Sequence, residues 1–190
     1  QPYMGLGNSL QTAQGGGAGG VGGWVELGRT TLGSAGTTIS VASLADKRYY
    51  KVLFSGLQTG SNVNPTIRYN NDSGSTYADR NSFSGGADST SVSRTNSNPF
   101  NGGTLDTFAV QYLANLSTKE KLSTVHSLNQ GASGAGTVPV RTENTHKWTN
   151  TAAAINRIDY INAANMATGS EVVVLGWDPA DTHTTNFWEE

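Results

Sequence analysis

Residues 171–177 read Glu-Val-Val-Val-Leu-Gly-Trp, and this stretch carries the clearest information about the fold. Val172 to Leu175 are four consecutive apolar residues, so an extended strand here presents apolar side chains on both faces. Such a pattern is typical of a strand inside a sheet. The stretch therefore predicts a central, buried β-strand.

Eight further runs with strand character precede it, separated by short stretches of turn residues. Phe108, Val110 and Tyr112 share one face of their strand, and Pro65 indicates an edge strand or a strand start for 63–69. This spacing is typical of sandwiches and barrels, and we expect an all-β, jelly-roll-like antiparallel β-sandwich of about nine strands. The expected strands cover residues 24–32, 37–41, 49–57, 63–69, 104–113, 121–128, 138–148, 155–161 and 171–177.

Two segments between these strands have a different character. Residues 72–101 have almost no apolar periodicity, and we expect long loops at one end of the sandwich. Residues 116–122 contain Ser117 and Glu120 at the spacing of a helix capping box. We expect a turn there rather than a full helix.

Composition supports the all-β interpretation. The chain of 190 residues contains 23 Thr, 19 Ser, 17 Asn and 24 Gly, which favour strands and tight turns, whereas strong helix formers are scarce. Its length fits one folded domain, which we place at 24–190.

Charge and cysteine content exclude several function classes. The net charge is −2, so a basic surface for nucleic acid is not expected. No apolar run reaches the roughly 20 residues that a membrane span needs, so we expect no membrane partner. The chain has no Cys, which excludes disulfides and thiolate chemistry.

Residues 1–23 differ from the rest, because 15–23 contain seven glycines in nine positions. A stretch with this much backbone freedom does not fold alone. It is either a disordered tail or an extended anchoring segment that orders on binding. In the second interpretation the anchoring residues are Pro2, Tyr3, Met4 and Leu6, and the glycines form a tether.

Catalytic and metal-binding motifs are not found. The three His are far apart in sequence without an HExxH motif, no GxSxG elbow is present, and the glycine run lacks the Lys-Ser/Thr of a phosphate loop. Acidic pairs suited to a glycosidase arise by chance in a sandwich of this size. We therefore expect no enzyme activity, no cofactor and no metal site.

A glycan-binding face is the remaining candidate site. Trp148 lies in a polar strand and is the best candidate for an exposed aromatic, although partial burial against the sandwich is the favoured alternative. Tyr69 and Tyr77 flank a turn that contains Asp72. This turn has some likeness to a cation site, but side-chain-to-backbone hydrogen bonds explain the same residues. The possible ligand face thus comprises Tyr69, Asp72, Tyr77 and Trp148.

Several of these segments resemble a known group of proteins. Pro2-Tyr3-Met4-Gly5 is similar to the Pro-Tyr-Ile-Gly start of many phage tail-fibre and capsid-fibre proteins. Residues 27–32, 38–41, 49–52, 69–77 and 171–177 resemble strands of β-sandwich virion proteins from tailed phages, especially marine ones.

The resemblance covers most of 24–177 and implies a jelly-roll-like sandwich with a structural role on the virion surface. It implies a capsid decoration or fibre component that is attached through residues 1–23 to a major capsid protein or another virion protein, in several copies. It carries over no active-site residues. The alternative is a carbohydrate-binding module of a host-recognition tail fibre.

Overall fold

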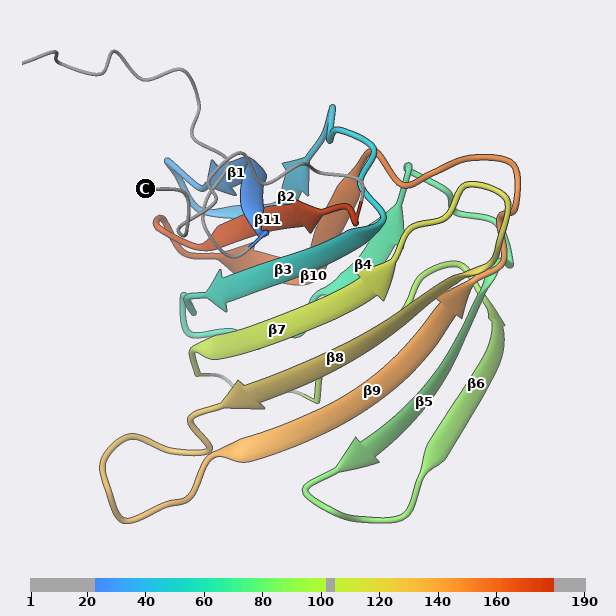
Figure 1. Ribbon diagram of the computed structural model, residues 1–190. Coiled ribbons are helices and arrows are strands. Elements are labelled where there is room, and N and C mark those ends of the chain that lie inside the picture. The colour runs from blue at the N-terminus through green and yellow to red at the C-terminus, as the bar shows by residue number, and fades with distance from the viewer. Residues whose placement is uncertain (1–22, 102–104, 180–190) are drawn as a thin grey trace, which may run out of the picture.

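The computed structural model describes residues 23–101 and 105–179, which form an all-β antiparallel sandwich (Figure 1). The anchoring residues Pro2, Tyr3, Met4 and Leu6 lie outside this described part of the chain. Eleven strands are present in it. They are β1 (Val25–Thr31), β2 (Gly36–Val41), β3 (Tyr49–Gly56), β4 (Thr66–Tyr69), β5 (Tyr77–Phe83), β6 (Ser89–Arg94), β7 (Thr107–Ala114), β8 (Lys121–Asn129), β9 (Val140–Trp148), β10 (Ile158–Met166) and β11 (Glu171–Trp177).

The strands form one large sheet and one small sheet. The large sheet has eight strands in the order β1-β11-β3-β7-β8-β9-β5-β6, and the small sheet has three in the order β2-β10-β4. Neighbouring strands pair antiparallel throughout. The predicted antiparallel β-sandwich is confirmed, and each of the nine predicted strands corresponds to an observed one.

The prediction of long loops across 72–101 is wrong, because this segment contains β5 and β6. The residues of β5 that face inward include Asp79 and Asn81, which are buried although polar. Burial was inferred from apolar side chains, and a strand with a polar inner face has no apolar periodicity to detect. The expected turn at 116–122 is confirmed, since a turn leads there into β8.

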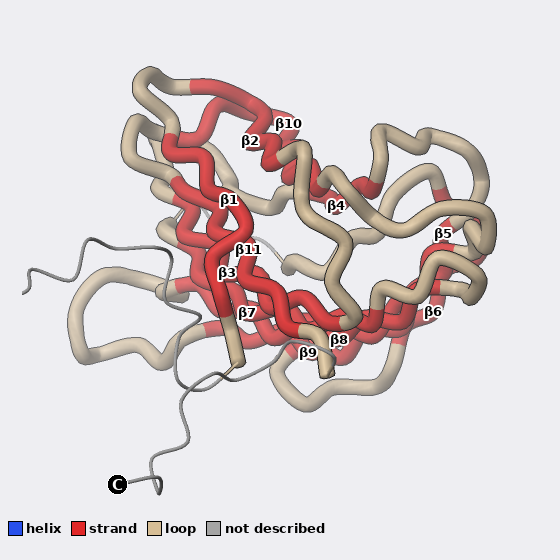
Figure 2. The backbone as a smooth tube through the Cα atoms, turned by 45° about the horizontal axis from the view of Figure 1, so that its top comes forward, coloured by secondary structure: helices blue, strands red, loops and turns tan. Residues whose placement is uncertain are grey.

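The small sheet covers one half of the large sheet (Figure 2). Tyr160 of β10 stacks on Phe54 of β3 with ring centroids 4.8 Å apart, and Phe100 packs edge-on against both rings. The interface between the layers is apolar. Its buried residues include Ile39, Val41, Val52, Ile67, Ile158, Val172 and Val174.

Loops cover the other half, where β8, β9 and β5 lie. The Ser127 hydroxyl donates a hydrogen bond to the Pro99 carbonyl at 3.1 Å, and the Lys121 ammonium donates to the Asn150 carbonyl at 2.7 Å. These bonds tie the 95–101 and 149–157 loops to the inner face of the sheet. The inner face of this half is therefore buried by these loops together with the Tyr69 ring of β4, which stacks on His146.

The stretch that indicates the fold, β11, lies between β1 and β3 as an interior strand. Val172 and Val174 point into the core, while Val173 and Leu175 point to the opposite, outer face. The prediction from Pro65 is also confirmed, because it immediately precedes β4, an edge strand of the small sheet.

Candidate functional site

The structure brings the four residues of the predicted ligand face together, but it buries their rings. Tyr69, Tyr77 and Trp148 are each 1% exposed, and the ring centroids of Tyr69 and Trp148 are 5.8 Å apart. The prediction of a ligand face is therefore corrected: these rings belong to the core, and no sugar can stack on them. The alternation of β9 places Trp148 on the inner face.

Asp72 organises the turn beside this cluster. Its carboxylate accepts hydrogen bonds from Trp148 Nε1 at 2.7 Å, the Gly74 amide at 2.8 Å and the Thr76 hydroxyl at 2.8 Å. Partial burial acts to raise the pKa of Asp72, but these three hydrogen bonds outweigh it and hold the pKa below its ordinary value. The turn is thus held by local hydrogen bonds, as expected, and the described residues contain no cluster of three or more potential metal ligands.

A chain of buried hydrogen bonds extends from the same cluster. Gln111 Nε2 donates to the Tyr69 hydroxyl at 2.6 Å, and this hydroxyl lies 2.6 Å from His146 Nε2. His146 Nδ1 lies 2.7 Å from Asn144 Oδ1, which can only accept, so Nδ1 carries the proton. Burial lowers the pKa of His146 to about 3, so the imidazole is neutral at pH 7. The chain fixes side chains of β7, β4 and β9 relative to one another.

Two buried ionisable groups border this chain. Burial raises the pKa of Asp79, whose carboxylate accepts a hydrogen bond from the Ser97 hydroxyl at 2.5 Å. Lys121 is 1% exposed, places its ammonium 5.3 Å from the centroid of the Trp148 ring, and has a pKa lowered by burial. Lys121 also donates to the Ser117 and Asn150 carbonyls, whereas Asp79 Oδ2 is buried without a hydrogen-bond partner among the described residues.

The outer face of the large sheet has the opposite character. On β8 the inward positions hold Lys121, Ser123, Ser127 and Asn129, whereas Leu122 and Leu128 point outward and are 61% and 44% exposed. The predicted common face of Phe108, Val110 and Tyr112 is confirmed, and it is also the outer face. A contiguous patch of exposed apolar side chains is a candidate interaction surface.

These outward side chains gather around β7. We define the outer apolar face as the apolar side chains of β11, β3, β7 and β8 that point away from the small sheet, together with Trp24. Polar side chains lie among them on the same side: Lys51, Ser55, Thr124, His126 and Glu171. Trp24 packs edge-on against Tyr112 with centroids 6.3 Å apart, and Tyr49 stacks on Trp177 at 5.6 Å. The face comprises Trp24, Tyr49, Leu53, Phe108, Val110, Tyr112, Ala114, Leu122, Leu128, Val173, Leu175 and Trp177.

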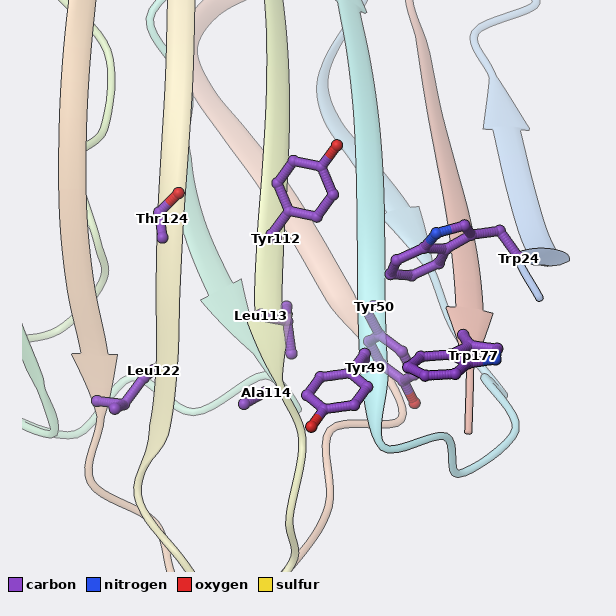
Figure 3. A pocket seen from close by; sticks show the side chains of 9 residues that line it. All are labelled: Trp24, Tyr49, Tyr50, Tyr112, Leu113, Ala114, Leu122, Thr124 and Trp177. Atoms are coloured by element: carbon purple, nitrogen blue, oxygen red, sulfur yellow. The ribbon is translucent and has the colours of Figure 1, made fainter. Parts of the chain in front are cut away.

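A hollow of about 380 Å³ lies within this face (Figure 3). Trp24, Tyr49, Tyr112 and Trp177 line it together with Leu122. A second hollow of about 680 Å³ shares Leu122 and Thr124 with the first and continues over β9, β5 and β6. The outer side of the sheet therefore carries two neighbouring hollows, the first lined by aromatic rings of β3, β7 and β11 and the second by side chains of β9, β5 and β6.

The chain enters the sandwich beside this hollow. Gly23 has a φ of 85°, and a Cβ placed on it would lie 2.5 Å from the Trp177 ring, so only glycine fits there. Trp24 follows directly and lies over the outer apolar face (Figure 3). Residues 1–22 thus join the domain at the edge of this face.

Charged groups flank the outer apolar face on both sides. On the β1 and β11 side, Arg29 forms an ion pair with Glu26 at 2.6 Å and lies 3.7 Å from Glu171. On the β9 side, Lys147 pairs with Glu120 at 2.8 Å, and Arg141 makes no side-chain hydrogen bond or ion pair with another described residue. The β1 and β11 flank therefore carries one more carboxylate than cation. On the β9 flank, Arg141 and Glu143 point outward two positions apart, and neither forms an ion pair with another described residue.

Sequence reasoning did not find this face as a site. The apolar residues of 121–128 do not share one face, because Val125 points inward while Leu122 and Leu128 point outward. The detectable signal was that β8 places two leucines in one phase and only one apolar residue, Val125, in the other.

No family model, curated protein or solved structure matches the chain. Within residues 23–101 and 105–179, no helix has the length and apolarity to cross a bilayer.

Proposed function

We propose that this chain is a structural component of a phage particle, a capsid decoration or fibre domain that joins the assembly through its N-terminal segment and the outer apolar face. The observation that carries the proposal is the pattern of β8, which exposes Leu122 and Leu128 while it buries Ser and Asn side chains. Folding alone gains nothing from this arrangement, whereas burial in an assembly gains about 25 cal/mol for each Å² of apolar surface removed from water.

The position of the N-terminal segment supports the same proposal. Residues 1–22 meet the domain at Gly23, which lies against Trp177 in the hollow. An anchoring segment with Tyr3, Met4 and Leu6 therefore leaves the domain on the side that also presents the outer apolar face. Two weak attachments on one side of the molecule reinforce each other through effective concentration. The likeness of the strand segments to tailed-phage virion proteins is the reason for proposing a phage particle as the assembly.

The test alters the gene in the phage that encodes it and counts the copies of this chain in purified particles by quantitative mass spectrometry. Deletion of residues 1–22 and the substitution Leu122→Asp should each lower the copy number at least tenfold, while His126→Gln, a substitution of another exposed β8 residue, should not. Both altered chains should remain folded by circular dichroism. Particles that carry either altered chain at full copy number would refute the proposal.

A second candidate function is glycan binding, which the aromatic lining of the 380 Å³ hollow favours. Sugar rings pack on exposed aromatic side chains, and Tyr112 is exposed in the hollow and Tyr49 partly so. Calorimetry of the full chain with a panel of bacterial surface polysaccharides tests this. Tyr112→Ala should abolish any heat of binding, and the absence of heat with every polysaccharide would remove this candidate.

A further inference from the structure

The proposed function leaves open what covers the outer apolar face. The register of the large sheet answers this, because it fixes which outward side chains lie in one row across the strands. One row runs Glu171, Ser55, Phe108, Leu128, Arg141 on β11, β3, β7, β8 and β9. Another runs Trp177, Tyr49, Ala114, Leu122, Lys147 on the same strands. In both rows β7 is central.

We propose that the outer apolar face packs against the same face of a second copy of this chain, about a two-fold axis that crosses β7 and lies about 15° from its direction, half of the roughly 30° at which packed sheets cross. The inference rests on the proposed function, since it names the partner of the same face. Rotation by 180° about this axis keeps each row in place and exchanges its ends. Strand β11 of one copy then faces β9 of the other, and β3 faces β8.

Charge complementarity follows from this exchange. Glu171 lies two strands from β7 on one side, and Arg141 lies two strands from β7 on the other side of the same row. The two-fold axis therefore brings Glu171 of each copy opposite Arg141 of the other, and the contact occurs twice. Arg141 has no side-chain ion-pair partner among the described residues of its own chain, so it is available for this contact.

Apolar groups match in the same way. Tyr49 of one copy faces Leu122 of the other, and Phe108 and Tyr112 lie on the axis and face their own counterparts. Trp177 faces Lys147, and an ammonium group placed above an indole ring makes a favourable cation–π contact. The most exposed apolar side chains of β7 and β8 are thereby covered.

The geometry of sheet packing is compatible with these pairs. Packed sheets cross at about 30°. Two strands from the axis, at a distance of about 10 Å, this crossing shifts each row by about 5 Å relative to the row that it faces. The shift is smaller than the spacing of about 7 Å between neighbouring rows. Arg141 is long enough to span that displacement. The face measures about 24 Å in each direction, so the contact would bury on the order of 1,200 Å², at the lower end of the range for specific interfaces.

The experiment is a charge-swap cycle on the full chain, read by sedimentation velocity between 1 and 200 μM. The wild-type chain should dimerise in this range. Glu171→Arg and Arg141→Glu should each weaken dimerisation at least tenfold, because each places like charges opposite each other twice. The double variant should dimerise at least threefold more tightly than either single variant, because it restores opposite charges in exchanged positions. It should stay weaker than wild type, because Glu171→Arg places a guanidinium beside Arg29 of its own chain.

Lys119→Glu, in the turn between β7 and β8, is the control and should leave dimerisation unchanged. A wild-type chain that stays monomeric at 200 μM overturns the inference, as does a double variant as weak as the single ones. The inference can fail while the proposed function holds. If the chain is monomeric but its Leu122→Asp variant is lost from particles, a different protein covers the outer apolar face. A monomer that binds a polysaccharide through Tyr112 also overturns the inference.

Discussion

The inner faces of β8 and β9 and the outer face of β8 have the reverse of the polarity that the hydrophobic effect alone predicts. Inward positions of these strands hold Ser123, Asn144 and His146, all buried, whereas the outward positions of β8 include the exposed leucines Leu122 and Leu128. In the half of the large sheet that the small sheet covers, the inner face is apolar, as is usual for a β-sandwich.

The comparison shows that burial and hydrophobicity are separate properties. Buried polar groups are tolerable where each finds a hydrogen-bond partner, and the inner chain from Gln111 through Tyr69 to His146 meets that condition. The exposed apolar groups of β7 and β8 are what the proposed assembly would cover. Three pairs of identical residue types, one on each face, make the comparison measurable: Trp148 with Trp24, His146 with His126, and Tyr69 with Tyr112.

The largest difference is expected for the tryptophans. Trp148→Ala removes a fully buried ring together with its hydrogen bond to Asp72 and its contact with the Lys121 ammonium, and should lower the free energy of unfolding by about 3–5 kcal/mol. Trp24 is 37% exposed, and Trp24→Ala should cost less than about 1 kcal/mol. Urea denaturation of both variants measures this. Equal losses would contradict the assignment of the two faces.

Much of the sandwich was predictable from the sequence because most strands carry a chemical signal. Val172 to Leu175 identify an interior strand, and Pro65 identifies an edge. β5 and β6 were missed because their signal is absent: β5 buries Asp79 and Asn81, and β6 is exposed along most of its length.

The location of the candidate site was less predictable. Phe108 and Tyr112 alternate as core residues do, and the period of a strand shows which residues share a face but not which face is covered. The polar environment of Trp148 suggested exposure, but the polar residues around it are buried with it. Only the packing of loops on β8 and β9 distinguishes inside from outside there.

The histidine pair gives a pH dependence of intermediate size. His146 has a pKa of about 3 in the folded state and an ordinary value of 6.5 in the unfolded chain. Between these values the unfolded state binds a proton that the folded state excludes, so stability decreases as the pH falls below 6.5. Lowering the pH from 7 to 5 should cost about 2 kcal/mol through this group. Urea denaturation at pH 7, 6 and 5 measures the slope.

Two comparisons isolate this contribution. His146→Gln should flatten the slope between pH 7 and 5, and His126→Gln, on the exposed outer side of β8, is the matched substitution of a histidine that is not buried. The raised pKa of Asp79 acts in the opposite sense, since it stabilises the fold at low pH and this contribution is lost as the pH rises through the folded-state value. Because Asp79 is present in every variant, it cancels in the difference. An unchanged slope in His146→Gln would show that the imidazole is not kept neutral by burial.

The smallest and most specific difference is expected for the tyrosines. Tyr69→Phe removes one hydroxyl that accepts a hydrogen bond from Gln111 and donates to His146 Nε2, and leaves two buried groups without that partner. It should cost about 1–2 kcal/mol, although the ring and its packing are retained. Tyr112→Phe removes an exposed hydroxyl with no hydrogen bond to the described residues and should change stability by less than about 0.5 kcal/mol. Since both substitutions delete the same atom, any difference in urea midpoint reports the hydrogen bonds of the inner face alone. Equal midpoints would mean that water satisfies Gln111 and His146 as well as Tyr69 does, and that the inner face of this half is wet rather than sealed by its loops.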